Sequence, residues 1–141
     1  ALNGEPLTVA GDGSQTRSIC YVDDLIEGIL ALLQSDLSGP VNIGNPHEIS
    51  VLDLANWIRD LSGSESTTEF VPRPEDDPEI RQPDITQAQQ LLGWSPRVPI
   101  ETALKQTIAW FREHPDFSAA RGKTAADAGE DDEGSGPHVS A

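Results

Sequence analysis

The pattern of apolar and polar positions near the start of the chain predicts two short strands. Leu7–Ala10 and Thr16–Val22 are rich in β-branched and apolar residues, which favour extended structure. The residues between them, 11–15 (GDGSQ), include two glycines that can adopt the positive φ of a tight connection. The pattern therefore predicts a β-hairpin. A period of two places three side chains on one face of its second strand: Arg17, Ile19 and Tyr21.

Two helices are predicted in the middle of the chain from apolar positions spaced for a 3.6-residue turn. The first has Asp23 and Asp24 as its N-cap and first-turn acids and extends to about Gln34. The second, over residues 50–63, opens with the S-x-x-D spacing of a capping box and has a glycine as its C-terminal stop.

Further elements complete an alternation of strands and helices. Short apolar runs predict a buried strand over Pro40–Gly44 and another over Thr67–Val71. Four prolines exclude regular structure from residues 72–83. A short helix is expected over residues 84–93, and a helix with a regular apolar face from Ile100 to His114. The alternation predicts the α/β class.

The charge balance excludes several classes of partner. Nine basic and 24 acidic side chains among 141 residues give a net charge of −15, which repels nucleic acid and anionic membranes. No apolar run approaches the roughly 18–20 residues of a membrane span, and no signal peptide is visible. The single cysteine, Cys20, cannot form an internal disulfide and fits a reducing compartment, so we expect a cytoplasmic protein. Its apolar neighbours favour a place in a strand core over a catalytic thiol.

The composition changes at Ser118. From there on the chain lacks Leu, Ile, Phe, Trp and Tyr, and such a stretch cannot bury enough apolar surface to order itself. We therefore expect one folded part, residues 1–117, followed by an acidic disordered tail, residues 118–141. The chain contains no methionine, not even at position 1, which suggests a fragment.

Two arginines are the candidate anion ligands. Arg17 lies on the predicted strand, and Arg81 is the only cation within residues 76–84 (DDPEIRQPD). Guanidinium groups bind phosphate bidentately and stay charged, so two of them converging on a pyrophosphate would form a clamp. The alternative is that Arg81 only neutralises the acids around it. The spacing Gly11-x-Gly13 indicates a turn, because no Lys-Ser/Thr and no third glycine follow.

Several motifs together carry a resemblance to a known family: residues 6–25 (PLTVAGDGSQTRSICYVDDL), 41–46 (VNIGNP), 76–85 (DDPEIRQPDI) and 92–96 (LGWSP). The combination resembles the second half of extended short-chain dehydrogenases of the NAD-dependent epimerase/dehydratase family, and within it the UDP-glucuronate decarboxylases that make UDP-xylose. The similarity runs from about Gly4 to Phe111. It implies a C-terminal substrate-binding subdomain plus the last strand and helices of an incomplete Rossmann-type sheet.

The resemblance also implies roles for matched positions. Thr8, Val9 and Ala10 would line the nucleotide base of a UDP-sugar. Arg17 and Arg81 would hold its diphosphate, and Asp84 would help to fix the loop near the ribose. The family usually has Tyr at position 10 and Phe at position 19, where this chain has Ala10 and Ile19.

The family's chemistry needs NAD, a glycine-rich dinucleotide turn and a Tyr-x-x-x-Lys pair. In this chain Leu25 stands four residues after the only tyrosine, and the dinucleotide turn is absent. We therefore expect no catalytic, cofactor-binding or metal-binding residue here, with NAD bound by a missing N-terminal Rossmann part of a homodimeric parent. Three alternatives stay open: part of a related epimerase or 4,6-dehydratase, a non-catalytic nucleotide-sugar-binding module, and an interaction fragment.

Overall fold

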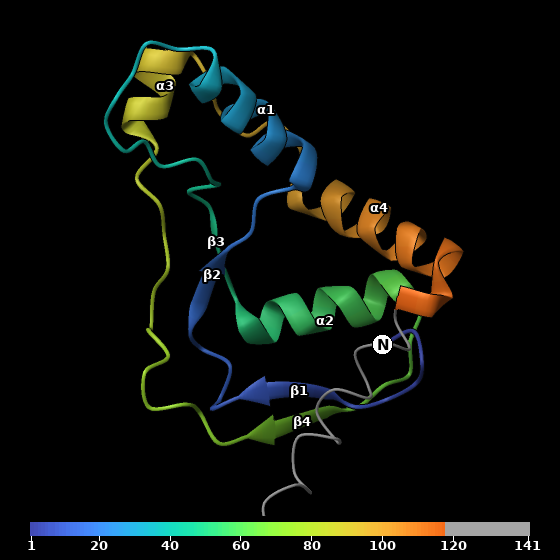
Figure 1. Ribbon diagram of the computed structural model, residues 1–141. Coiled ribbons are helices and arrows are strands. Elements are labelled where there is room, and N and C mark those ends of the chain that lie inside the picture. Colours follow the sequence, from blue (N-terminus) through green and yellow to red (C-terminus); the bar gives the residue numbers. More distant parts are fainter. Residues whose placement is uncertain (118–141) are drawn as a thin grey trace, which may run out of the picture. The chain divides into compact units, whose positions relative to one another are not determined.

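The computed structural model describes residues 1–117, and within them four strands and four helices alternate (Figure 1). The elements are β1 (Leu7–Ala10), β2 (Thr16–Ser18), α1 (Val22–Leu33), β3 (Glu48–Ser50), α2 (Val51–Ser62), β4 (Thr68–Val71), α3 (Thr86–Leu92) and α4 (Ile100–Glu113). The α/β class is confirmed. The tail expected over residues 118–141 lies outside the described residues. The chain divides into two units after Ile108, and the packing below is that of the first, Ala1–Ile108.

The predicted β-hairpin is wrong. β1 pairs in parallel with β4, with Leu7 opposite Thr68. β2 pairs antiparallel with β3, with Thr16 opposite Ser50. The first two strands therefore belong to two different sheets, although they follow one another in the sequence.

The loop between β1 and β2 explains this separation. Gly11 and Gly13 have φ of 62° and 77°, so the predicted turn is present. Its carbonyl groups, however, accept hydrogen bonds from the start of α2: Val51 N donates to Gln15 O at 3.0 Å, and Leu52 N to Gly13 O at 3.1 Å. The loop thus supports the first turn of α2 and does not fold β2 back onto β1.

The ends of α2 are as predicted. Ser50 Oγ accepts a hydrogen bond from Asp53 N at 3.0 Å, which is the N-cap bond of the predicted capping box, and donates one to the Asp53 carboxylate at 2.6 Å, which joins the two side chains. Gly63 has φ of 61° and forms the left-handed C-cap. Residues close in sequence determine both ends.

The start of α1 differs from the prediction. Its N-cap is Tyr21, which makes no side-chain capping bond, and Asp23 and Asp24 lie in the first turn. The carboxylate of Asp24 is 4% exposed and accepts hydrogen bonds from Arg97 N at 3.1 Å and Val98 N at 2.9 Å. Asp24 therefore joins α1 to the segment before α4.

A small core holds α1 and α3 together. Ile85, Ala88 and Trp94 are buried as one cluster, and Val41 and Ile43 pack against it. The strand predicted over Pro40–Gly44 is not present, because no described strand pairs with this segment. Its apolar side chains are nevertheless used in the core.

Within residues 1–117, every helix is too short or too polar to cross a membrane.

Candidate functional site

The segment between β4 and α3 brings the candidate residues toward β2. Thr16 N donates to Glu79 O at 2.8 Å, so this segment lies beside β2 (Figure 1). It then runs along residues 42–46: Gln82 Nε2 donates to Pro46 O at 2.8 Å, and Asn42 Nδ2 donates to Asp84 O at 3.1 Å. Arg17, on β2, and Arg81 therefore lie on neighbouring parts of the chain although 64 positions separate them in sequence.

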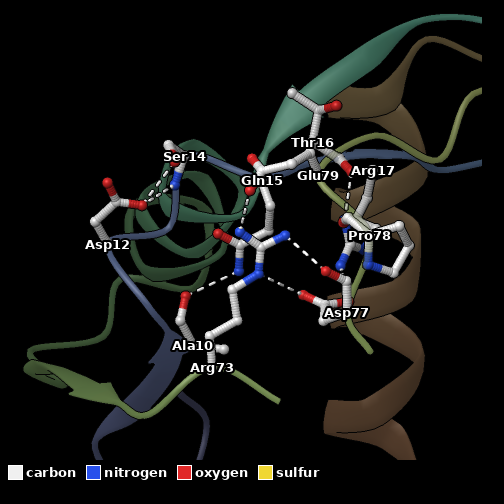
Figure 2. A network of polar contacts seen from close by, with 10 residues as sticks. All are labelled: Ala10, Asp12, Ser14, Gln15, Thr16, Arg17, Arg73, Asp77, Pro78 and Glu79. Atoms are coloured by element: carbon white, nitrogen blue, oxygen red, sulfur yellow. Dashed lines mark hydrogen bonds and ion pairs between the residues drawn. The ribbon is translucent and has the colours of Figure 1, made fainter. Parts of the chain in front are cut away.

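Arg17 is held by three acceptors (Figure 2). Its Nη1 donates to Thr16 O at 2.6 Å and to Pro78 O at 3.1 Å, and its Nη2 forms an ion pair with the carboxylate of Asp77. The side chain is 23% exposed. Because a guanidinium carries more N–H donors than these acceptors occupy, Arg17 is fixed in place with donor capacity left over.

Arg73 completes the network, and the sequence analysis did not single it out. Its Nη1 donates to Glu79 Oε1 at 2.6 Å and its Nη2 to Asp77 O at 2.7 Å, while Nε lies 3.4 Å from Asp77 Oδ2 (Figure 2). The hydrogen bond to Glu79 raises the pKa of Arg73 above its ordinary value. Arg73 precedes Asp77 by four residues and Glu79 by six, and this spacing is the feature of the sequence that could have indicated these contacts.

Arg81 is exposed, and within residues 1–117 no acid pairs with its guanidinium. The nearby acids Asp77 and Glu79 pair instead with Arg17 and Arg73. The alternative in which Arg81 neutralises its neighbours therefore has no contact to support it. Arg81 presents an uncompensated cation beside the strand that carries Arg17.

Asp84 precedes α3 and lines a cavity. Its carboxylate accepts a hydrogen bond from Thr86 N at 2.9 Å, and hydrogen bonds from Thr86 hold the pKa of Asp84 below its ordinary value. The cavity, of about 360 Å³, is also lined by Pro46, Gln82 and Gln89. An ionised carboxylate at such an opening can accept hydrogen bonds from hydroxyl groups of a ligand.

The three residues expected to line a base differ in accessibility. Thr8 is exposed and Ala10 is half-buried. Val9 is 1% exposed, so its side chain belongs to the core. The Ala10 carbonyl accepts a hydrogen bond from Gln15 Nε2 at 2.8 Å. Only Thr8 and Ala10 therefore have side chains at a surface.

Neither metal chemistry nor thiol chemistry is indicated at the site. Among residues 1–117, no group of three His, Cys, Asp or Glu side chains is placed to hold a metal ion. Cys20 is half-buried and lies just beyond β2. Burial, and secondarily the charge of Asp24, raise the pKa of Cys20 and so lower the reactive thiolate fraction.

We expect Ser14→Ala to raise the pKa of Asp12 toward its ordinary value. Both the hydroxyl and the backbone N–H of Ser14 donate to Asp12 Oδ1, at 2.7 and 2.9 Å, and these bonds lower the pKa of Asp12. A lowered pKa means that Asp12 stabilises the loop at neutral pH and loses this effect as the pH falls through that pKa. NMR titration of the carboxyl carbon measures the change, and Ser18→Ala should leave it unaltered, because the Ser18 hydroxyl has no hydrogen-bond partner among the described residues.

Comparison with known proteins gives a consistent result. The family model described as NAD dependent epimerase/dehydratase matches residues 1–44. UDP-glucuronic acid decarboxylase 1 of Danio rerio is 48% identical over 119 residues, which cover 84% of this chain and 28% of that protein. UDP-glucuronic acid decarboxylase 2 of Arabidopsis thaliana is 44% identical over 126 residues, covering 89% and 28%.

The chain is thus similar to the NAD-dependent epimerase/dehydratase family over residues 1–44, and to UDP-glucuronic acid decarboxylases over most of its length. It spans 28% of the length of these curated relatives.

Parts of solved UDP-sugar epimerase structures have the same fold as this chain. The UDP-glucuronic acid 4-epimerase of Bacillus cereus, in complex with UDP-glucuronic acid and NAD, is 32% identical with a TM-score of 0.74, over 79% of this chain and 37% of that one. The UDP-glucose 4-epimerase of Thermotoga maritima, with UDP-glucose, is 30% identical with a TM-score of 0.76, over 80% and 37%.

Proposed function

We propose that this chain is the UDP-sugar-binding part of an NAD-dependent UDP-glucuronate decarboxylase, which converts UDP-glucuronate to UDP-xylose. The observation that carries the proposal is the pair of arginines. Arg17 is fixed and keeps N–H donors that no acceptor occupies, and Arg81 is exposed and has no ion pair within residues 1–117. The names of the relatives, several of them UDP-glucuronic acid decarboxylases, support the choice of substrate.

In this proposal the two guanidinium groups bind the diphosphate. Charge-assisted bidentate bonds suit a phosphate oxygen pair, and both groups keep their charge at any working pH. Asp84 accepts hydrogen bonds from ribose hydroxyls at the cavity that it lines, while Thr8 and Ala10 contact the base. Binding energy gained on the nucleotide, remote from the reacting bond, holds the sugar where the reaction occurs.

The glycine loop of residues 11–15 does not fit the diphosphate of NAD. A dinucleotide turn presents backbone N–H groups at the start of a helix that follows it. The loop of residues 11–15 leads instead into a strand, and its carbonyl groups face the start of α2. We therefore assign NAD to the whole protein and derive no step of the reaction through it here. A cytoplasmic location and a homodimer belong to the same proposal.

Calorimetric titration of the whole protein with UDP tests the two arginines. We expect Arg17→Ala and Arg81→Ala each to weaken binding by about 1.5–3 kcal/mol, or roughly 10- to 100-fold, because each loses charge-assisted hydrogen bonds. Arg59→Ala is the matched control: this arginine is on α2 and pairs only loosely with Asp60, at 3.6 Å. Unchanged affinity in both site variants would remove the basis of the proposal.

Epimerisation is the second candidate, because a UDP-glucuronic acid 4-epimerase is among the structural neighbours. The two reactions differ in atom balance: decarboxylation releases CO₂ and leaves a UDP-pentose, whereas epimerisation retains the carboxylate. Incubation of the whole protein with UDP-glucuronate labelled at C6 separates them. Release of label as CO₂ supports the decarboxylase, and its retention in the nucleotide sugar supports the epimerase.

A further inference from the structure

Asp77 lies between two guanidinium groups in the network of Figure 2. Its Oδ1 pairs with Nη2 of Arg17, its Oδ2 lies 3.4 Å from Nε of Arg73, and its carbonyl oxygen accepts a hydrogen bond from Nη2 of Arg73 at 2.7 Å. The side chain is 19% exposed, against 74% for Glu79. Asp77 is thus the better buried of the two acids and the one that contacts both arginines.

The contacts of Asp77 join two segments that carry candidate ligands. Asp77 and Pro78 both bind Arg17, and Glu79 O binds Thr16 N at 2.8 Å. These consecutive residues fix the segment on β2 directly before it reaches Arg81. The Asp77 carboxylate is the charged part of this attachment, because the other two contacts use backbone oxygens.

We propose that Asp77 is a positioning residue for the anion site: it holds the guanidinium of Arg17 against residues 77–84, so that Arg17 and Arg81 meet the diphosphate together. The inference rests on the proposed function, since it assumes a diphosphate ligand at Arg17. A guanidinium fixed in place, as that of Arg17 is, loses less conformational entropy on binding than a free side chain does. Arg73 offsets the negative charge of Asp77, so Arg17 keeps its attraction for an anion.

The alternative is that Asp77 weakens ligand binding, because its carboxylate takes the N–H donors of Arg17 that the ligand needs. A carboxylate that competes with a phosphate for the same donors would weaken binding, and its removal would strengthen it. The geometry favours positioning, because Asp77, Thr16 O and Pro78 O together occupy only some of the five N–H donors of Arg17 and leave others for an anion.

The test measures binding of UDP and of uridine to the whole protein, by calorimetry and by ligand-observed NMR. We expect Asp77→Asn to weaken UDP binding roughly tenfold and to leave uridine binding unaltered, because uridine lacks the phosphates that Arg17 contacts. Glu79→Gln is the matched control; it removes an acid that contacts Arg73 and not Arg17, and we expect less than about a twofold change.

A double-mutant cycle separates positioning from a general structural role. In an Arg17→Ala background, Asp77→Asn should add less than about a twofold loss of UDP affinity, because its effect passes through Arg17. Independent losses in the two variants, or unchanged or tighter UDP binding by Asp77→Asn, would overturn the inference while the wild type still binds UDP. A wild type that binds no UDP would overturn the proposed function and this inference with it.

Discussion

Replacing Trp94 with alanine is expected to lower the free energy of unfolding by about 3–5 kcal/mol. The indole is 5% exposed and lies in the buried cluster with Ile85 and Ala88. Its Nε1 donates to Asp24 O at 3.0 Å. A Cβ added to Gly28 would lie 2.8 Å from the ring, so the backbone of α1 packs directly on it. Removal leaves a cavity between α1 and α3 that neither helix can fill without moving.

Urea denaturation followed by circular dichroism at 222 nm measures this loss, because the signal does not depend on the deleted indole. Trp57→Ala is the matched control. Its indole lies on α2 and is 41% exposed, so truncation there should cost much less. Equal losses in the two variants would show that the cluster around Trp94 is not the core of this unit.

Local signals predicted both ends of α2 and the C-terminal end of α3. The ends of α2 depend on contacts between residues close in sequence, made by Ser50, Asp53 and Gly63. The spacing of such residues in the sequence therefore predicts these contacts. The ending of α3 at Gly93, with φ of 63°, has the same origin. The strand runs over Leu7–Ala10 and Thr68–Val71 were also located, since composition alone marks a strand.

Strand pairing was not predictable by the same means. Two strands joined by a five-residue glycine loop have the sequence signature of a hairpin. The pairing depends on β4, and the loop carbonyls bind the start of α2. These partners are distant in sequence, and no local pattern indicates them. The strand predicted over Pro40–Gly44 was wrong for the same reason. An apolar run can pack in a core whether or not a neighbouring strand forms backbone hydrogen bonds with it.

The candidate site shows the same division. Arg17 could be picked out because its place on a predicted strand is a local feature, and Arg81 because it is the only cation within residues 76–84. The role of Arg73 depends on β4 pairing with β1, which places its side chain beside Gly11, 3.5 Å from where a Cβ there would lie. The contacts of Asp77 and Glu79 with Arg73 follow from that placement. Counting charges within residues 76–84 suggested that Arg81 neutralises the acids around it. In the structure Arg73 pairs with Asp77 and Glu79.

Gly13→Ala is expected to lower the free energy of unfolding by about 2–5 kcal/mol, from two separate costs. Gly13 has φ of 77°, where a side chain costs about 1–2 kcal/mol. A Cβ would also lie 2.7 Å from Val9 Cγ1 and 2.8 Å from Leu52 Cβ, and forcing a group into a filled space costs about 1–3 kcal/mol. Val9 is buried, so it cannot move aside easily.

Gly63→Ala is the matched control that separates these costs. Gly63 has a similar φ of 61°, and a Cβ there would meet no atom within 4 Å, so only the backbone cost of about 1–2 kcal/mol applies. The difference between the two variants in urea denaturation measures how tightly the loop packs on Leu52 and Val9. Because that loop leads directly into β2, a shift at Gly13 also displaces Arg17 and should weaken UDP binding, whereas Gly63→Ala should not. Equal destabilisation by the two substitutions would mean that the loop can yield to a methyl group, and that the start of α2 does not fix it.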